Sequence, residues 1–151
     1  MGTVAAISQP NLSVELLLGG RGVLQVTPRS SLDWVSVIRR GISPAAVDSL
    51  TKFIRVTQSE LARALGIPER TLARRKKEGV LNSEESAKLV RLARVVERAE
   101  KVFEDFDASL DWLKSPNAAM FGATPLSLLD TDIGGESVLD TLGRIEHGVF
   151  G

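Results

Sequence analysis

The sequence predicts an all-α protein: a helix-turn-helix bundle followed by a small helical C-terminal domain. Apolar residues recur at three- and four-residue spacing along most of the chain after residue 31, which is the period of an amphipathic helix. Several of these segments begin at Ser, Thr or Asn and end at Gly, the residues that cap helices at those positions. We expect a partly disordered extension over 1–30, a helix-turn-helix domain over 31–82 and a helical domain over 83–151.

The residue inventory excludes several classes of functional site. The 151 residues include no cysteine and one histidine, His147, so disulfides, thiolate metal sites and multi-histidine metal sites are excluded. No nucleophile–base pair or phosphate-binding loop can be recognised, and we predict no catalytic residues, no metal and no cofactor. No apolar run approaches the ~18 residues of a membrane span. Residues 1–10 lack the basic region of a secretory signal, so we expect a cytoplasmic protein with no membrane partner.

The net charge of zero hides an asymmetry between the two parts of the chain. Residues 1–101 carry 17 Lys and Arg against 10 Asp and Glu, a balance of +7. Residues 102–151 carry two basic residues against nine acidic ones, a balance of −7. Such a split indicates either two surfaces for different partners or solvated faces of uneven charge.

The first third of the chain gives weaker signals. Residues 23–26 are either a short strand or irregular, because glycines break the pattern before them. Residues 31–40 carry apolar side chains on one face and stop at Gly41, which predicts a short helix. Ser43–Pro44 predicts the start of a second helix, and its apolar stripe continues to about Val56.

Residues 57–77 predict a helix-turn-helix. Thr57 and Glu60 have the spacing of a capping box, in which each side chain accepts the other residue's backbone N–H. The short helix that they start ends at Gly66, a residue suited to a left-handed C-terminal position. A second helix over about 68–77 follows a tight turn. A supporting helix, a turn and an exposed second helix are the parts of a DNA-binding unit.

The second of these helices is basic, which predicts DNA binding. Arg70 and Arg74 lie four residues apart on one face, and arginine pairs two donors with guanine, so these two residues are the expected base contacts. The other basic residues are expected to meet phosphates, which set position without reading sequence. The predicted DNA-binding residues are Arg63, Glu69, Arg70, Thr71, Arg74, Arg75, Lys76 and Lys77. The alternative is a basic, solvated helix.

A second capping box, Asn82 to Glu85, predicts a long helix that continues to about Phe106. Its apolar residues follow a heptad spacing for more than two heptads. The stripe is either the core of the domain or the seam of a homodimer, because fewer than three heptads do not demand a coiled coil. The candidate dimer seam consists of Leu89, Leu92, Val96, Ala99 and Phe103.

The C-terminal residues predict one more helix and an apolar tail. Residues 131–135 contain two glycines and are interpreted as a break, so the helix is expected over about 136–147. One face of that helix carries Val138, Leu139, Leu142 and Ile145. The tail after it, Gly148-Val149-Phe150-Gly151, places two apolar residues between glycines.

Two stretches resemble known families. Residues 43–80, with QSELARALGIPERTLARRKKEG at their centre, resemble the phage-repressor-type (Xre) helix-turn-helix. Residues 110–151 look like the C-terminal domain of the MbcA/ParS/Xre antitoxins. The motifs that carry this second likeness are Leu110-Asp111-Trp112-Leu113, Pro116-Asn117, Gly122, Thr124-Pro125-Leu126, Leu128-Leu129, Thr131, Gly134 and Gly148. The stretch Ala118–Phe121 departs from that pattern, since a more glycine-rich approach to the loop is expected there.

The resemblance implies a non-enzymatic antitoxin with two partners. It implies binding to operator DNA, with repression of its own operon, and binding to a RES-domain toxin that consumes NAD⁺. The C-terminal end is expected to cover the toxin's NAD⁺ pocket, with Phe150 as an apolar anchor and with Glu146 and the terminal carboxylate facing toxin arginines. The toxin-binding residues are then Arg144, Glu146, His147, Gly148, Val149, Phe150 and Gly151. Such repressors usually read paired half-sites as homodimers. A stand-alone helix-turn-helix regulator, with a C-terminal dimerisation or ligand domain, is the alternative.

Overall fold

The computed structural model describes residues 12–148, and this part of the chain is helical without strands. The predicted all-α class is confirmed. None of the helices described has the length and apolarity needed to cross a membrane. The elements are α2 (Val14–Leu17), α3 (Arg21–Leu24), α4 (Ser31–Arg40), α5 (Ala45–Ile54), α6 (Gln58–Leu65), α7 (Glu69–Glu78), α8 (Ser83–Phe103), α9 (Phe106–Lys114), the 3-10 turns η1 (Ala118–Met120) and η2 (Pro125–Leu128), and α10 (Asp132–Glu146).

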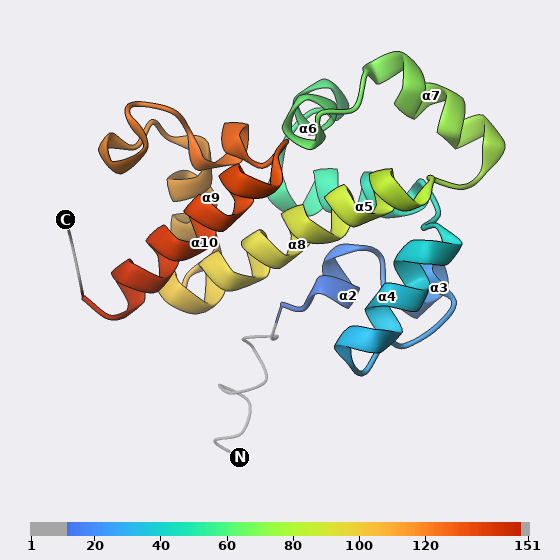
Figure 1. Cartoon of the computed structure of the whole chain (residues 1–151), viewed down its shortest axis with the longest axis horizontal. Helices are drawn as coiled ribbons and strands as arrows, with labels where there is room; N and C mark the ends of the chain where they lie inside the picture. The colour runs from blue at the N-terminus through green and yellow to red at the C-terminus, as the bar shows by residue number, and fades with distance from the viewer. Residues whose placement is uncertain (1–11, 149–151) are drawn as a thin grey trace.

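The long helix α8 is the axis on which the other elements pack (Figure 1). It contacts α2, α4 and α6 from the first part of the chain, and α9 and α10 from the last part. Leu89, Leu92 and Val96 on α8 are wholly buried, and each such aliphatic side chain contributes about 1.5–3 kcal/mol through burial. One continuous hydrophobic core therefore joins the helix-turn-helix to the C-terminal helices.

Within the expected extension over 1–30, residues 12–30 pack on the bundle, and residues 1–11 lie outside the described residues. Leu17 is wholly buried. The backbone N–H of Val14 donates to the Glu97 carboxylate on α8 at 3.2 Å. Residues 21–24 form the helix α3, not a strand. The sequence signal is weak because α2 and α3 have only four residues each, too few to establish an apolar period.

The helix α8 ends at Phe103, earlier than its apolar spacing predicts. Glu104 adopts the left-handed conformation (φ 55°), and the Asp105 carboxylate accepts the backbone N–H of Ala108 at 3.0 Å, which caps the start of α9. The apolar spacing conceals this turn because Phe106, the first residue of α9, packs against the same core.

The helix α10 begins at Asp132, where the sequence pattern suggested a break. The Thr131 hydroxyl caps it by accepting the backbone N–H of Gly134 at 2.9 Å. The glycine permits a close approach: a Cβ atom at Gly134 would lie 1.8 Å from the carbonyl oxygen of Leu128. The first turn of α10 therefore lies directly against η2, and glycine is required there by packing.

Replacing Gly134 with alanine is expected to destabilise the protein by about 3 kcal/mol, because the clash is with backbone that cannot move without displacing η2. Gly143 lies on the same helix, and nothing lies within 4 Å of a Cβ atom built there. Gly143→Ala is therefore the matched control and should stabilise by about 0.5–1 kcal/mol, since alanine is favoured over glycine inside helices. Urea unfolding measures both changes. Equal effects of the two substitutions would contradict the close packing at Gly134.

Candidate functional site

The helices α6 and α7 form the predicted helix-turn-helix. The Thr57 hydroxyl accepts the backbone N–H of Glu60 at 3.0 Å, and the Glu60 carboxylate accepts the backbone N–H of Thr57 at 2.7 Å, so the predicted capping box is present. The hydrogen bond from the backbone N–H of Thr57 to the Glu60 carboxylate lowers the pKa of Glu60. Gly66 ends α6 in the left-handed conformation (φ 70°). The buried side chains of Ile67 and Leu72 anchor the turn and α7 to the core.

The helix α7 carries an exposed basic face at the end of the molecule away from α9 and α10 (Figure 1). The side chains of Arg70, Arg74 and Lys77 are exposed, and Thr71 is half-buried. Within the described range Arg70 and Lys77 have no ion-pair partner, and Arg74 meets Glu78 only at 3.6 Å. We name Arg70, Arg74 and Lys77 the basic face of α7. Arg63, on α6, is exposed as well.

Arg75, predicted to contact a phosphate, is engaged inside the protein. Its Nε donates to the Glu85 carboxylate at 2.8 Å, and one of its terminal nitrogens donates to Glu78 at 2.9 Å. Hydrogen bonds to these two carboxylates raise the pKa of the Arg75 guanidinium. Only 19% of the side chain is exposed. Arg75 therefore joins α7 to α8, and its expected contact with a DNA phosphate stays a prediction.

Two other predicted DNA-binding residues also have partners within the chain. The Lys76 ammonium donates to Asp48 at 2.9 Å and to the side-chain oxygen of Gln58 at 2.7 Å. The Glu69 carboxylate accepts the Ser59 hydroxyl at 3.0 Å. Both contacts join α7 to the preceding helices and fix its angle. They favour a positioning role for Lys76 and Glu69.

Glu85 makes stability depend on pH. Burial raises the pKa of Glu85, but hydrogen bonds from Arg75 and from the backbone N–H of Asn82, with the charge of Arg75, outweigh burial, so its pKa lies below the ordinary value. The ionised group therefore stabilises the fold above the pKa of the unfolded chain, about 4.3, and this contribution is lost as the pH falls through the lower folded value. We expect Tm to fall on acidification, and to fall less in Glu85→Gln. Thermal melts at neutral and acidic pH measure this, and parallel curves would contradict it.

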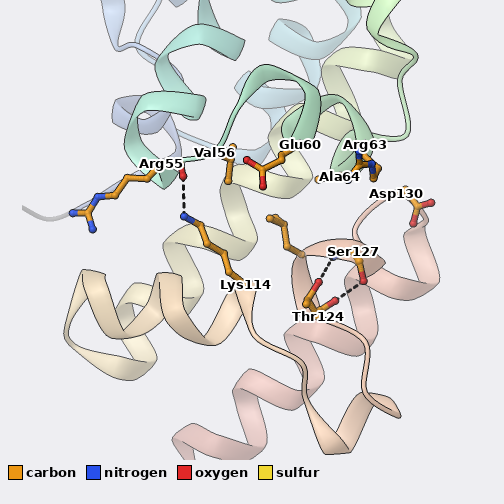
Figure 2. A pocket seen from close by; sticks show the side chains of 10 residues that line it. Arg55, Val56, Glu60, Arg63, Ala64, Lys114, Thr124, Ser127 and Asp130 are labelled. Carbon is orange, nitrogen blue, oxygen red and sulfur yellow. Dashed lines mark hydrogen bonds between the residues drawn. The ribbon is translucent and has the colours of Figure 1, made fainter.

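A pocket of about 390 Å³ lies where the helix-turn-helix meets the C-terminal elements (Figure 2). The Lys114 ammonium donates across this junction to the carbonyl oxygen of Arg55 at 3.0 Å. On the other wall the Ser127 hydroxyl donates to the carbonyl of Thr124 at 2.7 Å. The lining mixes cations, acids and apolar side chains: Arg55, Val56, Glu60, Arg63, Ala64, Lys114, Thr124, Leu126, Ser127 and Asp130. The lining includes two carboxylates, and that of Glu60 accepts the backbone N–H of Thr57. The geometry places the pocket at a junction between parts of the fold.

The second candidate surface is the end of α10. Val138 and Leu142 are wholly buried, so the helix is fixed against the core. Glu146 forms an ion pair with Arg98 on α8, and about a third of each side chain is exposed. In the free chain this pair already neutralises the charge that was expected to face toxin arginines. Arg144, His147 and Gly148 are exposed, whereas the predicted contacts Val149, Phe150 and Gly151 lie outside the described residues.

Comparison with known proteins decides the family. A model of the antitoxin Xre-like helix-turn-helix domain matches residues 33–94, and a model of the antitoxin Xre/MbcA/ParS C-terminal toxin-binding domain matches residues 98–148. The Antitoxin Xre of Yersinia enterocolitica serotype O:8 / biotype 1B is 36% identical over 118 residues, which cover 77% of this chain and 80% of that protein. The chain belongs to the Xre antitoxin family. Neither model that matches this Xre antitoxin describes an enzyme.

Two further similarities extend the comparison. This chain is 28% identical to the Prs ADP-ribosylating antitoxin of Sphingobium sp. strain YBL2 over 131 residues. These residues cover 80% of this chain and 82% of that protein. This chain also superposes on a chain from the crystal structure of the M. tuberculosis MbcT–MbcA toxin–antitoxin complex, with a TM-score of 0.53 and 23% identity. The superposition covers 72% of this chain and 96% of that one, and it shows a shared fold.

The candidate dimer seam of the Xre antitoxin lies inside one chain. Leu89, Leu92, Val96 and Ala99 have no exposed surface, and Phe103 packs on Trp112 of α9 with ring centroids 5.7 Å apart. The first four side chains have no free area to offer to a second copy, whereas Phe103 is half-buried. These four residues therefore belong to the core of one chain, which is the other interpretation that the heptad spacing allowed.

Sequence reasoning missed the residues that hold the two candidate surfaces in place. Arg91 on α8 forms an ion pair with Asp132 and donates to the carbonyl of Leu129 at 3.0 Å, which fixes the start of α10. Arg98 fixes its end through Glu146. Arg91 and Arg98 are seven residues apart on one helix and therefore share a face, a signal that is readable once α10 is known to lie beside α8.

Proposed function

We propose that this Xre antitoxin neutralises a RES-domain, NAD⁺-consuming toxin with its C-terminal segment, and that it represses its own operon by binding operator DNA. Both activities follow from surfaces on one chain. The function is stoichiometric binding, with the DNA and the toxin as ligands and with no reaction catalysed by the antitoxin itself.

One observation carries the proposal: the basic face of α7 and the exposed end of α10 lie at opposite ends of one continuous core (Figure 1). A ligand at one end leaves the other end uncovered. The arrangement therefore permits simultaneous binding of DNA and toxin. The rigid core also holds both surfaces in fixed positions, which lowers the entropic cost of binding each ligand.

The DNA-binding role is assigned to the basic face of α7. Arg70 and Arg74 are exposed and lie four residues apart, so both guanidinium groups can reach base edges in a major groove. Lys77 and Arg63 supply charge for phosphates, and Thr71 lies between the two arginines near the start of the helix. Two copies of the chain on paired half-sites would use a surface other than the buried seam of α8.

The toxin-blocking role is assigned to the end of α10 and the segment that follows it. Burial of Val138 and Leu142 provides a rigid base. The exposed Arg144, His147 and Gly148 begin the segment, and Val149 and Phe150 add apolar side chains by their chemistry. An apolar tip on a rigid base can occupy a preformed pocket with little loss of conformational freedom.

The name of one relative supports the choice of toxin. The relative from Sphingobium is named Prs ADP-ribosylating antitoxin, and the ADP-ribosyl donor of ADP-ribosylation is NAD⁺. A pocket that binds NAD⁺ is the site that a steric inhibitor would cover. We therefore propose that the partner of this chain is an enzyme that consumes NAD⁺.

The test begins with the neighbouring reading frames, where the proposal expects a RES-domain protein, and continues with an activity assay of that protein. We expect purified antitoxin to stop NAD⁺ consumption at an equimolar ratio, because each molecule blocks one active site. NAD⁺ consumption that continues at full rate with the antitoxin in excess would contradict the proposed function.

A further inference from the structure

One aromatic side chain of the C-terminal domain does not pack against the core. Phe121 follows η1, and its side chain is 100% exposed. It thus differs from Phe103 and Phe106, which pack against the core. Because Phe121 buries nothing, its ring adds no apolar burial to the fold and its whole surface is free for another molecule.

The loop that carries Phe121 is held by its own hydrogen bonds. The carbonyl oxygen of Asn117 accepts the backbone N–H groups of Met120 at 3.0 Å and Gly122 at 2.9 Å. The backbone N–H of Asn117 donates to the carbonyl of Ala123 at 3.0 Å, which closes the base of the loop. Met120 is buried and anchors it to the core. The exposed ring therefore stands on a well-ordered base.

The backbone at Phe121 is also unfavourable for its residue type. Its φ of 56° lies in the left-handed region, which costs a residue with a Cβ atom but not glycine. Phe121 thus combines a strained backbone with an apolar ring in water. Backbone strain of this kind is typical of ligand-contact sites, where the surroundings hold the residue in place.

We propose that Phe121 is a second anchor for the toxin, inserted into an apolar pocket on the toxin surface next to the site covered by the end of α10. The inference rests on the proposed function. The toxin is the occupant because residues 98–148 match the toxin-binding domain model and include this loop. In Figure 1 the loop around η1 lies at the same end of the molecule as the end of α10, away from α7 and its basic face. Buried aromatic residues are among the commonest energetic centres of protein interfaces.

The test compares affinities for the RES-domain protein by isothermal titration calorimetry. Phe121→Ala should weaken binding by about 10- to 100-fold, as expected for loss of an aromatic anchor. Phe121→Gly should weaken it as much while leaving Tm no lower than that of the unaltered chain, because glycine accepts the left-handed backbone. Leu32→Ala is the matched control: Leu32 on α4 is 77% exposed and lies outside the toxin-binding domain, so affinity should not change.

Several outcomes distinguish this inference from the proposed function. If both Phe121 variants bind as tightly as the unaltered chain while deletion of residues 147–151 abolishes inhibition, the second anchor is wrong and the proposed function stands. An equal loss of affinity in Leu32→Ala would also overturn the inference, because the effect would not be specific to this loop. If the unaltered chain does not bind the RES-domain protein, both ideas fail together.

Discussion

Deletion of residues 147–151 is expected to abolish toxin neutralisation while the protein still folds and binds DNA. The deletion removes His147 and Gly148, which are exposed, together with Val149, Phe150 and Gly151, which lie outside the described residues. Because this segment is proposed to fill the NAD⁺ pocket, the concentration needed to inhibit NAD⁺ consumption should rise by at least about 100-fold. The measurement is a titration of the toxin's NAD⁺ consumption with intact and truncated antitoxin.

The structure makes this truncation a clean experiment. The buried Val138 and Leu142 and the ion pair of Arg98 with Glu146 all remain, so α10 keeps its place on α8. Circular dichroism and operator binding should therefore match those of the intact chain. Arg144→Ala removes an exposed side chain within α10 and tests whether the toxin also contacts the base of the segment. Full protection by the truncated chain would exclude the blocking role of the C-terminal segment.

The second large effect is expected at the other end of the molecule. Replacing Arg70 and Arg74 together with alanine should weaken operator binding by about 100-fold or more, since each base-contacting arginine contributes about 1–3 kcal/mol. Neither side chain is buried, so the fold should be unaffected. Fluorescence anisotropy with operator and unrelated duplexes measures both the affinity and its sequence dependence.

Single substitutions separate contacts that read the base sequence from contacts that only add electrostatic attraction to phosphates. Lys77→Ala should weaken binding to both duplexes equally and lower the salt dependence, as expected for a phosphate contact. Arg39→Ala on α4 removes the same charge from an exposed position outside α6 and α7, and should change operator affinity little. If the double variant of Arg70 and Arg74 keeps the operator affinity of the unaltered chain, α7 is not the recognition helix.

The helix-turn-helix could be predicted from the sequence because its signals are local. The capping box of Thr57 with Glu60 and the left-handed Gly66 involve residues within one turn of each other, and the structure has both. The roles of Arg75 and Lys76 could not be predicted in the same way. Their partners include Glu85 on α8 and Asp48 on α5, and contacts between helices leave no periodic signal in a single sequence.

In the C-terminal part, two glycines led the sequence analysis to predict a helix break that is not present. The pair Gly134–Gly135 has the composition of a break, yet both residues lie inside α10. A Cβ atom at Gly135 would lie 2.9 Å from the side chain of Arg91, and one at Gly134 would meet the backbone of η2. The need for glycine comes from neighbours that are distant in sequence, so local propensity predicts the wrong structure there.

The charge asymmetry of the chain also has a partly internal explanation. Three of the nine acidic residues after position 101 pair with arginines of the first part of the chain. These ion pairs are Arg55 with Asp107, Arg91 with Asp132, and Arg98 with Glu146. Such exposed pairs contribute about 0–1 kcal/mol each, so they orient the two parts more than they stabilise them. Part of the charge asymmetry is therefore explained by contacts within the fold.

The most direct test of the central claim is whether the antitoxin and NAD⁺ compete for the toxin. A segment seated in the NAD⁺ pocket predicts competitive inhibition: the antitoxin concentration needed for half inhibition of the RES-domain protein should rise in proportion to NAD⁺ once NAD⁺ exceeds its KM. The chain lacking residues 147–151 should show no such inhibition. Inhibition by the intact chain that is independent of NAD⁺ concentration would contradict the account.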